Sequence, residues 1–283
     1  MLEVTPEVQH LIDLALAEDQ VFNDATTSAL IRPNVWGVGT FHAKAHGILA
    51  GLDVALAVFH RVEPSVETEA LMQDGHGLEP GSTIARVAGK ASTILRGERT
   101  ALNILQRMSG IATETARYVK AVEGYRVKIV DTRKTAPGLR YLDKHAVRVG
   151  GGHNHRMNLA DGVLIKDNHI ELLRHRGMTL PGILEQAREM APHTLKIEVE
   201  VTNLAELEEV LEGGAHIIML DNMSLEDMSK AVEMVGGRAL VEASGGITLE
   251  NVAAVAETGV DLISVGALTH SVTALDISLD IAA

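Results

Sequence analysis

Residues 195–221 read LKIEVEVTNLAELEEVLEGGAHIIMLD, and they contain the repeating unit from which the architecture follows. An apolar run ends near Glu200, an amphipathic segment ends in two glycines, and a second apolar run ends at Asp221. Asn203 precedes the amphipathic segment and Glu206 follows three residues later, a pattern typical of the start of a helix. The stretch therefore predicts a strand, a helix and a second strand.

The same alternation recurs from about residue 126 onward, with a strand-to-strand step of about 22 residues in the last three units. Alternation of this kind is typical of a parallel sheet covered by helices, and six or so units predict an incomplete α/β barrel. The six apolar runs are residues 127–131, 162–167, 195–201, 216–221, 239–244 and 262–267.

The first part of the chain lacks this regularity. Thr5-Pro6 predicts the start of a helix, residues 35–95 contain short strands broken by turns, and a long helix is expected near residues 97–123. Its apolar positions at helical spacing are Leu102, Leu105, Met108 and Ile111. We therefore predict an α+β domain over residues 1–110 and a barrel domain with the active site over residues 111–269, with the tail 270–283 packing back on the first domain.

Composition narrows the class of protein. The chain has 283 residues, of which 46% are hydrophobic but only 2% aromatic, so the core is expected to be aliphatic. Cysteine is absent, which excludes disulfides, thiolate metal sites and a cysteine nucleophile. We find no signal peptide and no apolar stretch long enough to cross a membrane, and we predict a soluble cytoplasmic protein.

The charge is unevenly distributed. The net charge of −13 argues against nucleic acid as a partner. Residues 126–166 nevertheless hold nine Lys or Arg against three Asp or Glu. A local cationic region in an acidic protein favours a small, highly charged anion as the ligand.

Polar residues lie at the carboxyl ends of all six predicted strands, which form the active face of an α/β barrel. One such residue alone would be ordinary surface, but six successive strands that end this way predict a site. The residues are Asp131, Arg133, Lys134, Lys166, Glu200, Asp221, Ser244, Gly245, Gly246 and Gly266. Glu198 and Glu200 share one side of a buried strand, so they require a nearby cation: Lys196, Lys134 or a divalent metal.

Two loops are rich in glycine, ASGGIT (243–248) and SVGA (264–267), and they predict phosphate cradles, the first helped by a helix that begins near Thr248. His153, His155 and His169 offer a different interpretation, a zinc site. We favour anion binding over zinc because no H-E-x-x-H or similar ligand spacing accompanies these histidines.

Longer motifs resemble those of the quinolinate phosphoribosyltransferases, also called nicotinate-nucleotide pyrophosphorylases (carboxylating). They are GERTALNILQRMSGIAT, DTRKTAPGLR, GGGHNHRMNLADGVLIKDNH, EVEV, LDN, EASGGIT and VGALTHS, in that order, and the resemblance runs from EDQVFNDATT to THSVTALDISL. It implies an N-terminal α/β sandwich, an incomplete barrel of the type II phosphoribosyltransferase kind and a homodimer, or an assembly of dimers, with shared active sites. It also implies transfer of phosphoribosyl from phosphoribosyl pyrophosphate to quinolinate with Mg²⁺, which gives nicotinate mononucleotide, pyrophosphate and CO₂ in de novo NAD synthesis.

The resemblance assigns roles to individual positions. It implies that Arg99 is lent across the dimer and that Thr132 binds substrate. The groups around the quinolinate carboxylates would be Arg133, His155, Arg156 and Lys166. Lys134, Glu200 and Asp221 would lie near the ribose and Mg-pyrophosphate, with Glu200 and Asp221 as metal ligands and with Lys134, Lys166, Glu200 and Asp221 as the catalytic residues. The 5-phosphate cradle would be Ser244, Gly245, Gly246, Val265, Gly266 and Ala267.

The chain departs from the family pattern at Asn23 and Asn158, where glycine is common. Asparagine tolerates left-handed backbone best after glycine, so we expect that conformation at both positions. Two alternatives to the main hypothesis stay open. One is a related phosphoribosyltransferase with another acceptor, either nicotinate or that of the paralogue found near molybdate transport genes. The other is a non-catalytic protein that binds phosphate ligands.

Overall fold

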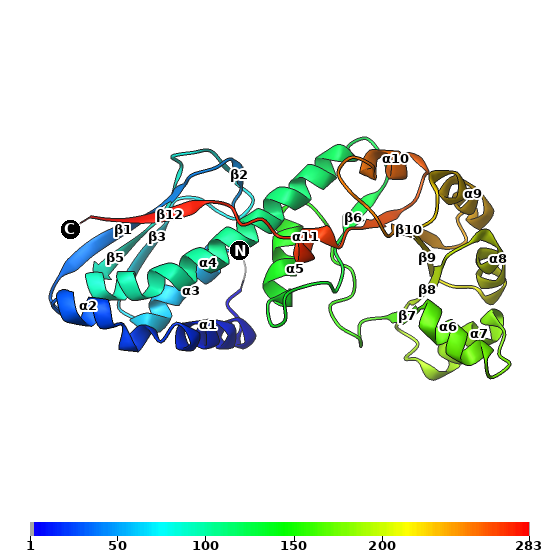
Figure 1. Cartoon of the computed structure of the whole chain (residues 1–283), viewed down its shortest axis with the longest axis horizontal. Coiled ribbons are helices and arrows are strands. Elements are labelled where there is room, and N and C mark those ends of the chain that lie inside the picture. Colours follow the sequence, from blue (N-terminus) through cyan, green and yellow to red (C-terminus); the bar gives the residue numbers. More distant parts are fainter. Residues whose placement is uncertain (1–2, 283) are drawn as a thin grey trace. The chain divides into compact units, whose positions relative to one another are not determined.

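The computed structural model describes residues 3–282 and divides them into two units, each with its own core (Figure 1). The N-terminal unit takes the chain up to residue 116, residues 135–151 and the chain from residue 269 onward. The barrel unit takes residues 117–134 and 152–268. The boundary therefore differs from the predicted one after residue 110, and residues 135–151 group with the N-terminal unit instead of the barrel.

A four-stranded antiparallel sheet forms the centre of the N-terminal unit, in the order β12-β1-β5-β3. Its strands are β1 (Trp36–Ala43), β3 (Glu67–Ala70), β5 (Thr83–Lys90) and β12 (Ile277–Ala282). Strand β12 comes from the end of the chain and pairs with β1, with Ala43 opposite Ile277 and Val38 opposite Ala282. The C-terminal tail thus provides an edge strand of the sheet that the N-terminal residues begin.

Helices accompany this sheet. They are α1 (Pro6–Glu18), α2 (Ala25–Leu30), α3 (Leu52–Val62), α4 (Ala91–Ala121) and α5 (Arg140–Val149), and the shorter elements are η1 (Val21–Asn23), β2 (Gly47–Ile48) and β4 (Gly77–Leu78). Helix α1 begins as predicted, because the Thr5 hydroxyl accepts the amide hydrogen of Val8 and Pro6 occupies the first turn.

The core of this unit is aliphatic, with two aromatic rings. The four apolar positions predicted for the long helix are all buried on α4: Leu102, Leu105, Met108 and Ile111. Phe41 of β1 meets Phe59 of α3 edge to face, with ring centroids 6.0 Å apart. Gly39 of β1 allows α4 to approach closely, because an added Cβ would lie 2.9 Å from the side chain of Ile94. These contacts explain why small residues alternate with large ones along β1.

Ion pairs explain why residues 135–151 belong to the N-terminal unit. On α5, Asp143 is fully buried and accepts two hydrogen bonds from the guanidinium of Arg107 on α4, both 2.9 Å long. His145 lies 3.1 Å from the carboxylate of Asp74, which also accepts the amide hydrogens of Gly51 and Leu52 at the start of α3. Helix α5 is therefore held by buried charges as well as by apolar packing.

The barrel unit contains six parallel strands in the order β6-β11-β10-β9-β8-β7. The strands are β6 (Lys128–Val130), β7 (Val163–Ile165), β8 (Ile197–Val201), β9 (Ile217–Asp221), β10 (Leu240–Ser244) and β11 (Leu262–Ser264). The edge strands β6 and β7 do not pair with each other within residues 3–282. The prediction of an α+β unit followed by an incomplete α/β barrel is therefore confirmed.

Helices lie outside this sheet (Figure 1). They are α6 (Asp167–Arg174), α7 (Leu180–Met190), α8 (Leu204–Gly213), α9 (Leu225–Val235), α10 (Val252–Glu257) and α11 (Ala267–His270). The side chain of Asn203 accepts the amide hydrogen of Glu206, and the Glu206 carboxylate accepts that of Thr202, which confirms the predicted helix start. No helix within the described part of the chain combines the length and apolar character required to span a bilayer.

The buried Arg107–Asp143 pair predicts a stability difference. Arg107→Met leaves the Asp143 carboxylate buried without its cation, so the free energy of unfolding is expected to fall by about 3–5 kcal/mol. Arg61→Met is the matched control, because Arg61 also makes two hydrogen bonds to one carboxylate, that of Asp13, with side chains 47% and 44% exposed. The control should lose at most about 1 kcal/mol. Urea unfolding of both variants checks this, and equal losses would contradict it.

Candidate active site

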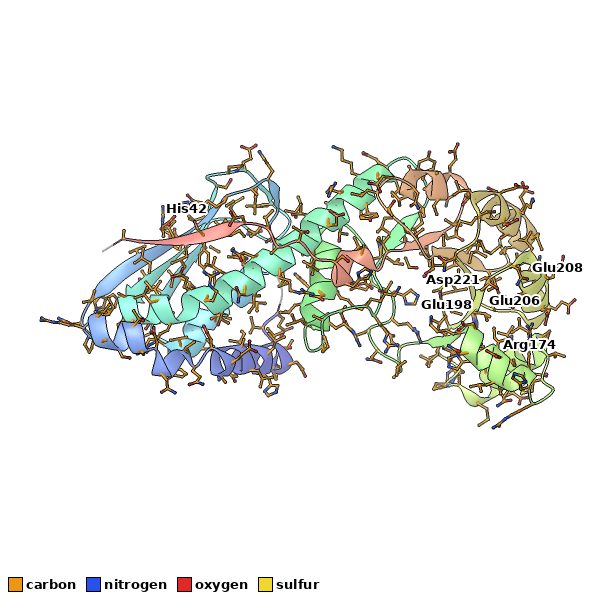
Figure 2. All side chains as sticks on the ribbon, viewed as in Figure 1. His42, Arg174, Glu198, Glu206, Glu208 and Asp221 are labelled. Carbon is orange, nitrogen blue, oxygen red and sulfur yellow. The ribbon has the colours of Figure 1, made fainter. Side chains whose placement is uncertain are left out.

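The carboxyl ends of the barrel strands form one rim, which encloses a cavity of about 710 Å³. The sheet register brings the polar ends together: Ser244 at the end of β10 is directly opposite Asp221 at the end of β9. Figure 2 shows Asp221 on the sheet, whereas Glu206 and Glu208 lie on α8 at the outside of the unit. The predicted site residues that line this rim cavity are Thr132, Arg133, Lys134, His155, Arg156, Lys166, Glu200, Asp221, Ser244, Gly245 and Gly246.

The remaining predicted residues lie elsewhere. Arg99 is exposed on α4 and lines a separate cavity of about 270 Å³ within the N-terminal unit. Val265 is buried, and its amide donates a hydrogen bond to the carbonyl of Val130, so this amide is committed to the sheet. Gly266 and Ala267 follow it but do not line the rim cavity.

Asp131 positions the residues that follow the triple glycine. It is fully buried, and its carboxylate accepts the amide hydrogen of His155 at 2.9 Å and the side-chain amide of Asn154 at 2.6 Å. His153 forms an isolated parallel bridge with Val130 of β6. Residues 153–155 thus run beside the edge strand, and the alternation of an extended chain turns His153 outward and His155 inward.

Arg133 and Arg156 bring guanidinium groups to the rim cavity. In each, the Nε atom is buried and has no hydrogen-bond partner within the described chain. One terminal nitrogen of Arg156 donates to the carbonyl of Gly162 at 3.3 Å. Burial lowers the pKa of Arg156, although a guanidinium stays charged at neutral pH. Two half-buried arginines at one cavity, each with a buried and unsatisfied Nε donor, indicate an anionic ligand.

The buried carboxylates of β8 are paired with different cations from those predicted. Glu200 accepts a hydrogen bond of 2.8 Å from the Lys166 ammonium, and Glu198 lies 3.2 Å from Nε2 of His155. Lys196 is exposed, so it is not the compensating group that the sequence suggested. The prediction that a cation must accompany these carboxylates was right, but the partners are Lys166 and His155.

The three histidines of the zinc hypothesis do not come together. His153 is exposed, and Nδ1 of His169 accepts the amide hydrogen of Lys166 at the start of α6. Only His155 belongs to a group with metal-ligating side chains, together with Glu198 and Glu242. Glu242 was missed from the sequence, where a glutamate within the apolar run ALVEAS was the available signal.

The two glycine loops differ from the prediction in one respect. Helix α10 begins at Val252, not near Thr248, because the side chain of Asn251 accepts the Thr248 amide hydrogen and donates to the carbonyl of Gly246. The loop after β10 is therefore shaped by this asparagine, and α10, with six residues, does not begin at the glycine loop as predicted.

Comparisons with known proteins identify the family. Residues 24–109 match the model of the quinolinate phosphoribosyl transferase N-terminal domain, and residues 111–280 match that of the C-terminal domain. The chain belongs to the quinolinate phosphoribosyltransferase family. It is similar to a probable nicotinate-nucleotide pyrophosphorylase [carboxylating] of Bacillus subtilis (44% identity, 84% of this chain, 81% of the relative). A quinolinate phosphoribosyltransferase [decarboxylating] of Nicotiana tabacum is 42% identical over 99% of this chain and 85% of its own length. The crystal structure of NadC from Streptococcus pyogenes superimposes with a TM-score of 0.94 at 39% identity, covering 100% of this chain and 99% of that one.

Within this quinolinate phosphoribosyltransferase fold, the prediction of left-handed backbone at Asn23 and Asn158 was wrong. The non-glycine residues with positive φ among residues 3–282 are Gln20 and Asn222. Asn23 ends the short helix η1, and the strained position before that helix is Gln20. The Asn158 side chain accepts the amide hydrogen of Ala160 at 2.8 Å and so forms a tight turn with ordinary backbone.

Asn222 lines the rim cavity and belongs to the LDN motif, but it was not among the site residues predicted from the sequence. Its φ is 54°, its amide donates to the carbonyl of Ser244, and its side chain donates to Asp221 at 2.9 Å. A Cβ added at Gly245, whose φ is +89°, would lie 2.3 Å from Oδ1 of Asn222. The LDN and SGG motifs therefore pack against each other, and Gly245 is required by space as well as by its backbone conformation.

This packing predicts the effect of a single methyl group. Gly245→Ala displaces Asn222 and the loop after β10, so the affinity for ribose 5-phosphate is expected to fall by at least about tenfold. Gly237→Ala is the matched control: its φ is +78°, but its Cβ would meet nothing within 4 Å. Titration calorimetry of both variants separates the two effects. If both lost affinity equally, backbone strain and not the contact with Asn222 would be responsible.

Proposed function

We propose that this protein transfers the phosphoribosyl group from phosphoribosyl pyrophosphate to quinolinate, with release of pyrophosphate and CO₂ and formation of nicotinate mononucleotide. The observation that carries the proposal is the pair of half-buried arginines, Arg133 and Arg156, whose buried Nε donors lack partners. They line a cavity that His155, Lys166 and the glycine loop also line. The family's relatives named above carry this activity in their names.

The acceptor brings two carboxylates into a partly enclosed cavity, and each requires a cation. We assign Arg133, His155, Arg156 and Lys166 to this task, with Thr132 beside them on the same loop. Arginine can hold a carboxylate through two parallel hydrogen bonds, which fixes the direction of the pyridine ring. With the ring fixed, its nitrogen can be held against the anomeric carbon of the ribose, and orientation of this kind supplies a large part of the lowering of the barrier.

Departure of pyrophosphate gives the ribose oxocarbenium character, so nearby carboxylates stabilise the transition state. We assign Glu200, Asp221 and Lys134 to this part of the cavity. Glu200 and Asp221 offer the carboxylate oxygens that Mg²⁺ prefers, and both line the rim cavity, so they fit the role of metal ligands. When bound, Mg²⁺ neutralises charge on the pyrophosphate leaving group.

Formation of the C–N bond makes a pyridinium, whose positive charge stabilises the electron pair left on the adjacent ring carbon when its carboxylate departs as CO₂. A proton from solvent then takes the place of the carboxylate on that carbon. We assign Lys166 to stabilise the negative charge that develops in this step, and Glu200 accepts a hydrogen bond of 2.8 Å from its ammonium. Ser244, Gly245 and Gly246 are assigned to the 5-phosphate, together with the loop from Val265 to Ala267. The amide of Val265 is committed to the carbonyl of Val130, so it is not assigned to the phosphate itself.

Arg99 is assigned to the active site of a partner subunit in a homodimer. Its exposure on α4 and its absence from the lining of the rim cavity are consistent with a group that serves another copy. A cytoplasmic location stays a prediction of the sequence.

The assignment of the acceptor is tested by a product assay. The purified protein with phosphoribosyl pyrophosphate and Mg²⁺ should release equimolar CO₂ and pyrophosphate from quinolinate, and nicotinate should give at most about one hundredth of that rate, because the second carboxylate is missing. Labelled CO₂ and a coupled pyrophosphate assay measure both products. Turnover of nicotinate alone would transfer the assignment to a related phosphoribosyltransferase, and binding without turnover of either acceptor would indicate a non-catalytic binder.

The role of Arg156 is tested by substitution. Arg156→Ala removes one carboxylate clamp, so kcat/KM for quinolinate should fall by at least about a hundredfold, while the far-UV circular dichroism stays unchanged. Arg176→Ala, an exposed arginine in the turn after α6, is the control and should keep the activity of the unchanged protein within about twofold. Near-normal turnover of Arg156→Ala would remove Arg156 from the site.

A further inference from the structure

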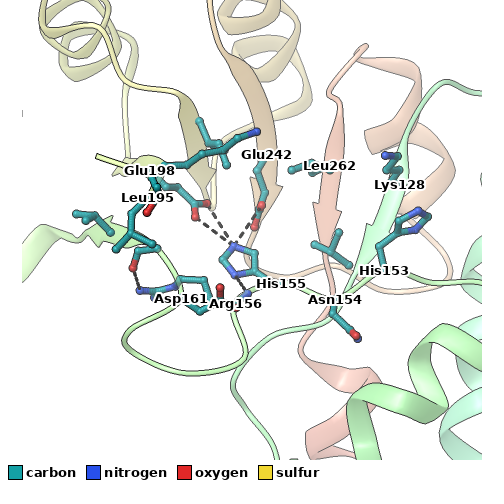
Figure 3. A pocket seen from close by; sticks show the side chains of 16 residues that line it. Lys128, His153, Asn154, His155, Arg156, Asp161, Leu195, Glu198, Glu242 and Leu262 are labelled. Atoms are coloured by element: carbon teal, nitrogen blue, oxygen red, sulfur yellow. Dashed lines mark hydrogen bonds and ion pairs between the residues drawn. The ribbon is translucent and has the colours of Figure 1, made fainter. Parts of the chain in front are cut away.

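A cluster of three ionisable side chains lies inside the barrel sheet (Figure 3). Nε2 of His155 lies 3.2 Å from Glu198 of β8 and 3.5 Å from Glu242 of β10. The two glutamates come from strands on either side of β9 and point toward the same ring nitrogen. Their exposed fractions are 4% for Glu198 and 0% for Glu242, so neither carboxylate is solvated.

The transfer chemistry does not account for these two glutamates. Glu198 lines a second cavity of about 450 Å³ at the amino ends of the strands, and it is not among the residues that line the rim cavity. Neither oxygen of Glu242 has a hydrogen-bond partner that meets normal geometry. Burial of two carboxylates on one imidazole is costly unless the imidazole carries a positive charge.

We infer that Glu198 and Glu242 are positioning residues that hold His155 as a fixed imidazolium, so that the wall of the cavity that receives the acceptor keeps its positive charge. The inference rests on the proposed function, because it assigns a task to His155 in binding an acceptor carboxylate. Glu198 does not line the cavity that receives the acceptor, and Glu242 lines it but is fully buried. Both act through the orientation and the charge of the ring.

The surroundings of His155 act on its two ring nitrogens in opposite senses. At Nε2, the two carboxylates favour the proton. At Nδ1, the amide of Arg156 approaches to 2.7 Å and favours the neutral ring, in which Nδ1 is an acceptor. The main-chain amide of His155 is fixed by Asp131. The nearby positive charge is the guanidinium of Arg156. The charges of Arg133 and Asp161 act on the pKa of that guanidinium, the first lowering it and the second raising it.

The balance lies with the charged ring. Burial alone would lower the pKa of His155, but the hydrogen bonds and charges of Glu198 and Glu242 outweigh it and raise that pKa to about 10. Burial and the charge of Glu198 raise the pKa of Glu242, while His155 lowers it. Since the folded-state pKa of His155 is raised, its charge is present at neutral pH and is lost only as the pH rises through about 10. A carboxylate ligand in the rim cavity then meets a positively charged ring over the whole physiological range.

The test uses two isosteric substitutions, Glu242→Gln and Glu198→Gln, in the full-length protein. Each removes one of the two carboxylates that hold the imidazolium. Quinolinate KM is expected to rise by about tenfold, while KM for phosphoribosyl pyrophosphate stays within about twofold. The basic limb of kcat/KM for quinolinate should move to lower pH, measured from about pH 6 to about pH 10. Glu242→Asp, which keeps the charge, should restore part of the affinity. Glu212→Gln on the exposed face of α8 is the control and should match the unchanged protein.

A direct measurement separates this inference from the proposed function. Nitrogen-15 spectra of histidine-labelled protein, with the His155 signal assigned by its loss in His155→Gln, report the charge of the ring whether or not the protein turns over quinolinate. An imidazolium at neutral pH that becomes neutral in Glu242→Gln supports the inference. A neutral His155 ring in the unchanged protein overturns it, as does an unaltered quinolinate KM and pH profile in both glutamine variants. Stoichiometric zinc or manganese in the purified protein that disappears in Glu242→Gln would also overturn it, because the cluster would then be a metal site.

Discussion

The desolvation of acidic side chains inside the parallel sheet is the constraint on which the rest of the barrel unit depends. Glu198 and Glu200 lie on β8 and Glu242 lies on β10, on either side of β9, and all three are at most 9% exposed. Carboxylates in such a position cannot remain charged without cations within a few ångströms. His155 and Lys166 provide them, and both also line the rim cavity. The buried carboxylates therefore orient the two cations, and these are cations that an anionic ligand in the rim cavity would meet.

The gap between the two edge strands of the barrel is the place where His155 and Arg156 reach its interior. Strands β6 and β7 are the two edges of the sheet, and the chain that connects them carries His155 and Arg156 past the edge of β6. Asp131 at the end of β6 holds this connection through the amide of His155 and the side chain of Asn154. A closed barrel would fill that space with strand pairing. The incomplete barrel instead uses the gap to admit a loop whose side chains point into the interior.

The sequence predicted features that depend on neighbours along the chain, and it failed where the partner is distant. The start of α8 at Asn203 follows from local hydrogen bonding, and the position of Asp221 beside Ser244 follows from parallel topology. The pairing of Glu198 with His155, 43 residues apart, has no local signal, and Lys196 was chosen because it shares a strand with Glu198. The start of α10 was misplaced because Asn251 reaches back to Thr248 and Gly246, a competition between side chain and helix that the pattern does not reveal.

The two arginines of the rim cavity lower the free energy of unfolding, because each has a buried donor without a partner. The unsatisfied Nε donors of Arg133 and Arg156 each weaken the fold by about 1–3 kcal/mol, and that cost disappears only when a ligand supplies the acceptors. A fold that carries this cost requires compensating contacts elsewhere. Two of them lie outside the rim, the ion pair between Arg107 and Asp143 and the contact of 3.1 Å between His145 and Asp74. Arg133 and Arg156 both line the rim cavity, so a ligand there that supplies acceptors to them would lower this cost and link binding to stability. Under the proposed function, an anion with two carboxylates would offer these donors more acceptors than an anion with one. The unpaired groups that lower the stability of the unliganded protein would then also favour a dicarboxylate.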